Sequence, residues 1–308
     1  MDKDFFKKIR ILDGGMGQEL LARGLPSKGS LWSANALLNE NYHKLILETH
    51  LDFINAGAEV IVTTTFSSKR VRLRENNVEH KFEFLNKKAG EIAKKAKGLK
   101  NNVYIAGGLP PQNKVYEPDL RKNQEIHDNF YDQAKIINPY VDFFYLDVLS
   151  SVNEFRQAIK AIIPFNKPYL IGAHISTGRT LPSGEKINDI INKIDHNNLM
   201  GIMLSCVSPE NFELNINELK DLDIPFGFKL NGFEITNPKK GYANNLAKSI
   251  SKNPTEFLGK RNDLTPEIFF DFARKFKNSG ATILGGCCET SPNHIKEICK
   301  LKSRDLLL

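Results

Sequence analysis

Three cysteines stand at positions where thiol groups from separate segments would meet. Cys287 and Cys288 follow the apolar run 281–284 and two glycines, and Cys206 ends the apolar run 201–206. Adjacent cysteines do not readily bridge each other, because a disulfide needs Cα atoms farther apart than chain neighbours are. Small buried hydrophobic residues are the plain alternative, but a third cysteine in a matching setting favours metal binding. Three thiolates leave one position of a tetrahedral Zn²⁺ open, as in catalytic sites.

Cysteine content and apolar runs indicate the compartment of the protein. Only four cysteines occur in 308 residues, which argues against a disulfide framework and for a reducing environment. The first residues lack the charged and then apolar layout of a signal peptide. No apolar run has the length needed to cross a bilayer. We therefore expect a cytoplasmic protein with no membrane partner.

The charge balance is basic but dispersed. Lys and Arg number 43 against 36 Asp and Glu, a formal net charge of +7. The excess lies along several polar segments, without a basic cluster interleaved with aromatic residues and without a nucleic-acid motif. This pattern is typical of a solvated, lysine-rich surface that attracts small anions. We expect no nucleic-acid partner, and nothing in the sequence indicates an oligomeric state.

Short apolar runs alternate with longer amphipathic ones along the whole chain. The apolar runs predict strands at 9–13, 60–65, 103–107, 142–147, 168–175, 200–206, 225–230 and 281–285. The amphipathic runs predict helices near 41–56, 79–97, 122–137, 151–162, 186–197, 212–220, 265–278 and 292–300. Eight such repeats indicate an α/β fold, a (β/α)₈ TIM barrel forming one domain over 1–308, with a doubly wound sheet as the alternative. The long polar stretch 238–262 reads as an insertion that covers the site as a mobile segment.

In such a barrel the chemistry lies where strands end and the following loops begin. Asp13 follows the first predicted strand and Asp147 ends the fourth, in an apolar run where a carboxylate needs a partner. A substrate ammonium is one candidate partner for Asp147 and a structural Arg or Lys is the other. Asp13, taken alone, is better explained as a turn residue that bonds its own backbone. Cysteines that end the sixth and eighth strands flank the seventh, so their convergence on one metal is geometrically natural.

Other polar and aromatic residues near predicted strand ends have two readings each. Ser176 either contacts substrate or caps its loop, and His174 is read as a barrel-lining residue rather than a metal ligand. Trp32, the single tryptophan, either stacks on a cationic ligand or covers the barrel. Cys299 lies on the last predicted helix and is read as packing.

Several motifs together resemble one enzyme family, the zinc-dependent homocysteine S-methyltransferases of the betaine and S-methylmethionine type. They run in family order and span about residues 9–300, which makes the resemblance far more specific than any single match. The motifs lie at 12–17, 31–34, 50–58, 63–66, 178–179, 181–185, 206 and 285–288.

The resemblance implies a zinc barrel that transfers a methyl group from a small onium donor to homocysteine, forming methionine. It implies that Asp13 and a carboxylate after the fourth strand hold the homocysteine ammonium. No side chain is then expected as catalytic acid or base, because the nucleophile is the metal-bound thiolate of the substrate. S-methylmethionine is the favoured donor, with betaine and dimethylsulfoniopropionate open.

The chain departs from the family pattern at several site positions. Asp147 stands for a usual Glu, Thr64 and Ser205 each stand for a usual Asn, and Glu289 stands for a small residue. The strand-seven motif, which begins at Lys229, keeps only its Asn and Gly. Two other classes therefore stay open at this point: a non-catalytic relative that binds zinc and an amino acid, and a zinc-free barrel lyase. Metal analysis and a methionine-formation assay separate them.

Overall fold

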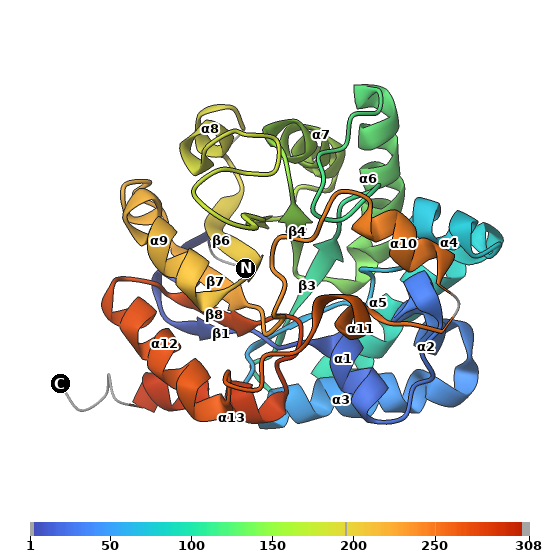
Figure 1. The fold of residues 1–308 in the computed structure, drawn as a ribbon, viewed down its shortest axis with the longest axis horizontal. Coiled ribbons are helices and arrows are strands. Elements are labelled where there is room, and N and C mark those ends of the chain that lie inside the picture. The colour runs from blue at the N-terminus through green and yellow to red at the C-terminus, as the bar shows by residue number, and fades with distance from the viewer. Residues whose placement is uncertain (1–2, 195, 250, 304–308) are drawn as a thin grey trace.

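A computed structural model describes residues 3–194, 196–249 and 251–303 (Figure 1). Eight parallel strands form one sheet in the order β1-β8-β7-β6-β5-β4-β3-β2. A parallel bridge between Leu12 and Val60 joins β1 to β2, so the sheet closes and the predicted (β/α)₈ barrel is confirmed. The strands are β1 Arg10–Ile11, β2 Val60–Val62, β3 Tyr104–Leu109, β4 Phe143–Leu149, β5 Tyr169–Ala173, β6 Leu199–Val207, β7 Phe226–Leu230 and β8 Ile283–Gly286.

Helices surround the sheet, and each predicted long helix is found within a few residues of its expected bounds. The largest differences are the helix predicted at 186–197, which ends at Asn192, and the one predicted at 212–220, which begins at Pro209. Ser208 caps the latter by accepting a hydrogen bond from the Asn211 amide. The helices that correspond to the predicted ones are α3 His43–Asn55, α5 Phe82–Gly98, α6 Asn123–Ile137, α7 Val152–Ile162, the six-residue α8 Ile187–Asn192, α9 Pro209–Lys220, α12 Pro266–Asn278 and α13 Pro292–Ser303.

Five short helices in the loops after strands were not predicted. At five to seven residues each, they are too short for an apolar period to stand out from loop composition. They are α1 Met16–Ala22, α2 Ala34–Leu38, α4 Arg70–Glu75, α10 Tyr242–Lys248 and α11 Pro254–Leu258.

Alternate side chains of the strands fill two separate cores. Residues such as Ile11, Ile61 and Ile171 pack against the helices, whereas their neighbours point into the barrel. The interior cluster comprises Phe5, Phe6, Leu12, Val60, Ala106, Phe143, Tyr145, Leu170, Met200, Met203 and Ile283. Phe5 and Phe6 come from a 3₁₀ turn, Lys3–Lys7, that closes the barrel at its N-terminal end. A ligand-binding site therefore has space only at the other end of the barrel, where the carboxyl ends of the strands lie.

The segment 238–262 contains α10 and α11 and lies over the carboxyl ends of the strands (Figure 1). The Tyr242 ring stacks on Tyr116 with centroids 6.1 Å apart, and the Asn253 amide donates to the Ser27 hydroxyl at 3.1 Å. These contacts join the segment to the loops after β1 and β3, and its role as an inserted, mobile cover stays a prediction.

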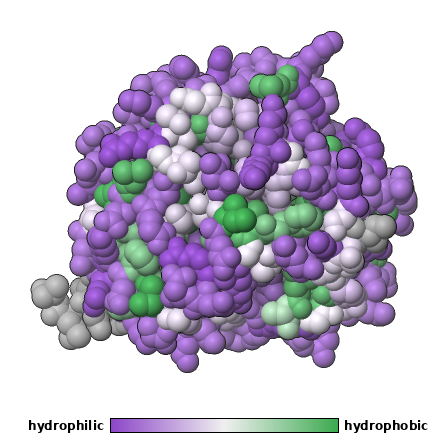
Figure 2. Space-filling model, in the orientation of Figure 1, coloured by the Kyte–Doolittle hydropathy of each residue, from purple (hydrophilic) through white to green (hydrophobic). Residues whose placement is uncertain are grey.

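The face shown in Figure 2 is largely hydrophilic, and its apolar residues gather in small, separate patches. Over the described ranges, no helix has both the length and the apolar character that a bilayer-crossing segment requires.

Candidate metal centre and substrate cavity

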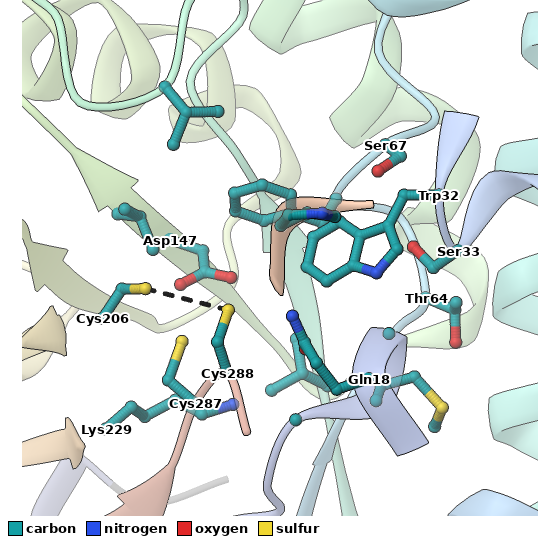
Figure 3. Close-up of a pocket in the computed structure, with 18 of the residues that line it drawn as sticks. Gln18, Trp32, Ser33, Thr64, Ser67, Asp147, Cys206, Lys229, Cys287 and Cys288 are labelled. Carbon is teal, nitrogen blue, oxygen red and sulfur yellow. Dashed lines mark hydrogen bonds between the residues drawn. The ribbon is translucent and has the colours of Figure 1, made fainter. Parts of the chain in front are cut away.

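The three cysteines converge at the carboxyl ends of β6 and β8. Their sulfur atoms all lie within 4.8 Å of one another, and the Cys206 and Cys288 sulfurs are 3.9 Å apart (Figure 3). In a tetrahedral site with Zn–S bonds of about 2.3 Å, two ligand sulfurs are separated by roughly 3.8 Å. The thiols therefore have the spacing of three ligands around one zinc ion.

Local backbone irregularities aim the site residues of β4 and β6. The β6–β7 pairing shifts register between Ser205 and Val207, and Cys206 within this bulge has a φ of 56°. The β4–β5 pairing shifts between Leu146 and Leu149, a stretch that contains Asp147. A bulge adds a residue to one strand and re-aims its side chains. The same device thus turns Cys206 and Asp147 toward the cavity, at a backbone cost that is usual at functional sites.

The two glycines before the cysteine pair allow the close approach of neighbouring segments. A Cβ at Gly286 would lie 2.2 Å from the Thr290 hydroxyl, and one at Gly285 would lie 2.9 Å from Leu12. The Thr290 hydroxyl donates to the Cys287 carbonyl at 2.6 Å and closes the turn that carries both thiols. Glycine at positions 285 and 286 is therefore a geometric requirement of this turn.

Hydrogen-bond donors surround the cysteine sulfurs. The Asn231 amide donates to the Cys206 sulfur at 3.3 Å, and the Tyr116 hydroxyl lies 3.1 Å from the same atom. Hydrogen bonds from Cys206 and Cys288 hold the pKa of Cys287 well below its ordinary value. Donors of this kind orient thiolate ligands and stabilise their charge.

Asp13 forms a buried ion pair that sequence reasoning did not find. One of its carboxylate oxygens accepts from the Lys229 ammonium at 2.9 Å, and the other accepts from the Val62 backbone amide at 2.7 Å. Asp13 is 1% exposed and Lys229 is 5% exposed. Both Asp13 oxygens are thus engaged within the protein. The available signal in the sequence was a lysine in the otherwise apolar strand β7.

Asp147 has a different environment from Asp13. Figure 3 shows its carboxylate beside the cysteines. Burial raises the pKa of Asp147 to about 7, against the opposing effect of the Lys229 charge. Burial also disfavours the Lys229 ammonium, but the Asp13 and Asp147 carboxylates outweigh this and raise the pKa of Lys229. Asp147 thus lies beside the cysteines and is influenced by the Lys229 charge and by a hydrogen bond from Tyr145, without the direct ion pair that Asp13 forms.

Trp32 lines the cavity, as expected of a ligand-contacting residue. Its backbone has a φ of 42°, and its ring meets Phe66 edge-on with centroids 6.0 Å apart. A Cβ at position 17 would lie 2.3 Å from the indole, so Gly17 leaves the space that the ring occupies. Further apolar side chains complete this wall: Val115, Tyr116, Val148, Phe233 and Tyr242.

Ser176 is not brought to the cavity wall with the other predicted residues. Its hydroxyl lies 2.7 Å from His174 Nε2, while His174 Nδ1 faces the Ser205 carbonyl at 3.2 Å. Burial lowers the pKa of His174 to about 4, which keeps the ring neutral, and the ring packs on Tyr116 with centroids 4.4 Å apart. In this arrangement Ser176 orients His174, which in turn supports Tyr116.

Glu289, one of the departures from the family pattern, connects the cysteine turn to the cover. Its carboxylate accepts from the Thr255 hydroxyl of α11 and lies 3.3 Å from the Lys260 ammonium. Its φ of 61° is a conformation that glycine adopts more easily. The side chain thus links segment 238–262 to the turn that carries Cys287 and Cys288.

Comparison with known proteins identifies relatives over almost the whole chain. The family model described as homocysteine S-methyltransferase matches residues 10–301. Homocysteine S-methyltransferase 2 of Saccharomyces cerevisiae is 25% identical and covers 95% of this chain and 93% of its own length. Homocysteine S-methyltransferase 1 of the same yeast is 26% identical, with 94% and 93% covered.

Solved structures share the fold. The homocysteine methyltransferase MmuM from Escherichia coli, in a metallated form, superposes with a TM-score of 0.77 at 20% identity, and 96% of each chain is covered. Its oxidised form gives a TM-score of 0.76 at 21% identity. With the family match over residues 10–301, the resemblance read from the motifs is confirmed, and the chain belongs to the homocysteine S-methyltransferase family of enzymes.

Proposed function

We propose that this protein is a zinc-dependent methyltransferase that moves a methyl group from a small onium donor to the sulfur of homocysteine, forming methionine. The carrying observation is the group of three cysteine sulfurs at the spacing of zinc ligands, beside the Asp147 carboxylate and an aromatic wall. The small number of cysteines suggests the cytoplasm as the location of the protein. The proposed product, methionine, suggests a role in methionine biosynthesis.

Cys206, Cys287 and Cys288 would hold the zinc ion. When bound, zinc would supply a Lewis acid that keeps the homocysteine sulfur deprotonated and nucleophilic at neutral pH. The chain supports this charge by the Asn231 and Tyr116 contacts to Cys206 and by the Lys229 ammonium, whose charge lowers the pKa of Cys287 further. These fixed donors need no rearrangement as charge moves during the reaction.

Homocysteine would be positioned by its ammonium group on Asp147. The expectation from the family assigned this role to both carboxylates, but both oxygens of Asp13 are already bonded, to Lys229 and to the Val62 amide. Asp13 then serves to hold Lys229 beside Cys287, and Asp147 contacts the substrate. No proton is transferred at carbon in this reaction, so the carboxylates position charge rather than act as acid or base.

The transfer is a displacement in which electrons and charge balance. A lone pair on the homocysteine sulfur forms the new S–CH₃ bond, and the bond from that carbon to the onium atom breaks. The onium sulfur or nitrogen keeps the bonding pair and leaves as a neutral thioether or amine. Trp32 and Phe66 offer aromatic faces to the donor cation before transfer. S-methylmethionine is the first candidate donor, with betaine and dimethylsulfoniopropionate next.

A donor panel tests the proposal. The zinc-loaded protein is incubated with homocysteine and each of the three onium donors, and methionine is quantified by mass spectrometry. Methionine formation that requires both zinc and an onium compound is the expected result. A protein that binds zinc and homocysteine but forms no methionine with any donor would instead be a non-catalytic relative.

A further inference from the structure

Part of the cavity wall comes from segment 238–262 rather than from the loops next to it. Tyr242 of α10 and Pro254 of α11 line the cavity together with Trp32. The helix α10 also packs against the 3₁₀ turn Gly29–Leu31, which directly precedes Trp32. If the two helices moved away from the barrel, water would therefore reach the cavity on the side where Trp32 lies.

Glu289 holds the second of these helices by a charged contact. Its carboxylate accepts a hydrogen bond from the hydroxyl of Thr255, in the first turn of α11, and lies 3.3 Å from the Lys260 ammonium. The Glu289 side chain is 6% exposed, whereas the Lys260 side chain is 56% exposed. The hydrogen bond from Thr255 is therefore the stronger part of the contact, because water screens the exposed ammonium.

The turn that carries the cysteines does not need the Glu289 side chain for its shape. Glu289 has a φ of 61°, a conformation in which glycine is favoured over a residue with a Cβ. Other groups close the turn, since the Thr290 hydroxyl donates to the Cys287 carbonyl and the Gly232 amide donates to the Cys288 carbonyl at 2.9 Å. The contacts that the carboxylate makes lie in segment 238–262, so the role of the side chain concerns that segment.

Glycines flank the two helices of the segment. Gly241, with a φ of 91°, precedes α10, and Gly259, with a φ of 71°, follows α11. Beyond Gly259 the chain is fixed to the barrel again, because the Arg261 amide donates to the Gly232 carbonyl at 2.8 Å. Backbone rotation at a few such positions is enough to move the piece of chain between them. The two helices thus have places to pivot once the Glu289 contact breaks.

We infer that Glu289 is a positioning residue that holds segment 238–262 closed over the cavity, and that ligands enter and leave when its contact with Thr255 breaks. The inference concerns access to the cavity, so it goes beyond the proposed function and applies to any ligand of this site. It also accounts for a glutamate at a position where the backbone favours glycine.

Fluorescence quenching and hydrogen exchange of the purified protein test this role. Trp32 is the single tryptophan, so quenching of its fluorescence by acrylamide reports access to the cavity. Glu289→Gly and, separately, Thr255→Val should raise the quenching constant. Amide exchange in α10 and α11 should become about 10- to 100-fold faster, as expected for the loss of a charge-assisted hydrogen bond. The Tm of Glu289→Gly should change little, because glycine suits the backbone of the turn.

A control and a double variant make the test specific. Glu213→Gln removes a carboxylate that pairs with Lys275 between α9 and α12, and it should leave quenching and exchange unchanged. The double variant Thr255→Val, Glu289→Gly should not exceed the larger single effect, since both changes break one contact.

Two results would overturn the inference. Unchanged quenching and exchange in both Thr255→Val and Glu289→Gly would show that this contact does not hold the segment. Faster exchange in the barrel strands of Glu289→Gly, with a lower Tm and unchanged quenching in Thr255→Val, would assign Glu289 to the stability of the cysteine turn instead.

Discussion

Asp13 and Asp147 are both buried aspartates at the carboxyl ends of strands, yet their replacement by asparagine should have different effects. Asp147→Asn removes the charge that would meet the homocysteine ammonium. A hydrogen bond to a charged group contributes about 1.5–3 kcal/mol, so homocysteine affinity should fall about 10- to 100-fold. The fold should remain stable, because burial raises the pKa of Asp147 to about 7 and its negative charge therefore opposes folding at higher pH.

Asp13→Asn, in contrast, should chiefly destabilise the protein. It leaves the Lys229 ammonium, 5% exposed, without its partner at 2.9 Å. Breaking one side of a buried ion pair costs about 3–5 kcal/mol, which corresponds to a fall in Tm of roughly 6–10 °C at about 2 °C per kcal/mol. The double variant Asp13→Asn, Lys229→Met removes both partners and should recover most of this loss.

Homocysteine titration by calorimetry and thermal unfolding by circular dichroism measure the two effects on the same samples. We predict that affinity falls mainly in Asp147→Asn and that Tm falls mainly in Asp13→Asn. If Asp13→Asn instead lost homocysteine affinity at an unchanged Tm, while Asp147→Asn bound normally, Asp13 would be the ammonium ligand. The ion pair between Asp13 and Lys229 would then not contribute to the stability of the protein as argued.

Three further predictions concern the metal, the donor and the stability of the barrel. Cys287→Ala and Cys288→Ala should each lose tightly bound zinc and methionine formation, whereas Cys299→Ala, on α13 away from the cavity, should keep both. Inductively coupled plasma mass spectrometry measures the bound metal. Full zinc occupancy in the double variant Cys287→Ala, Cys288→Ala would contradict the assignment. Trp32→Ala should raise the KM of an onium donor about 30-fold and that of homocysteine far less, since a desolvated cation on an aromatic face gains about 2 kcal/mol; equal effects on both substrates would count against donor stacking. Burial, with the nearby Asp119 charge, raises the pKa of Glu154 to about 7. The protonated side chain therefore favours the folded state; this contribution is fully present below about pH 4.5 and is lost as the pH rises through 7. Glu154→Gln should therefore raise Tm at pH 8 relative to the unaltered protein and change it little at pH 4.5, and thermal scans at both pH values check the sign.

Much of the architecture can be predicted from local patterns of apolar residues in this one sequence. The strands are buried on both faces, so they appear as continuous apolar runs, and the long helices show a clear apolar period. The cysteines end such runs, and parallel strands in a barrel bring their carboxyl ends to one rim. The sequence alone therefore determined the fold class, the family and the candidate metal ligands.

Pairings between distant segments were decided only by the closed barrel. Asp13 and Lys229 are 216 positions apart and meet because β1 and β7 both flank β8 and point these side chains into the same space. Which polar side chains point inward depends on bulges, as at Cys206, and on space left by a glycine, as at Gly17. The Ser176 hydroxyl bonds to His174 instead of lining the cavity, whereas Gln18 and Lys69, which lie just outside the motifs, do line it. The directions of these side chains follow from packing and from charge compensation across the whole barrel. Both act between residues that are far apart in the sequence, so no local pattern predicts them.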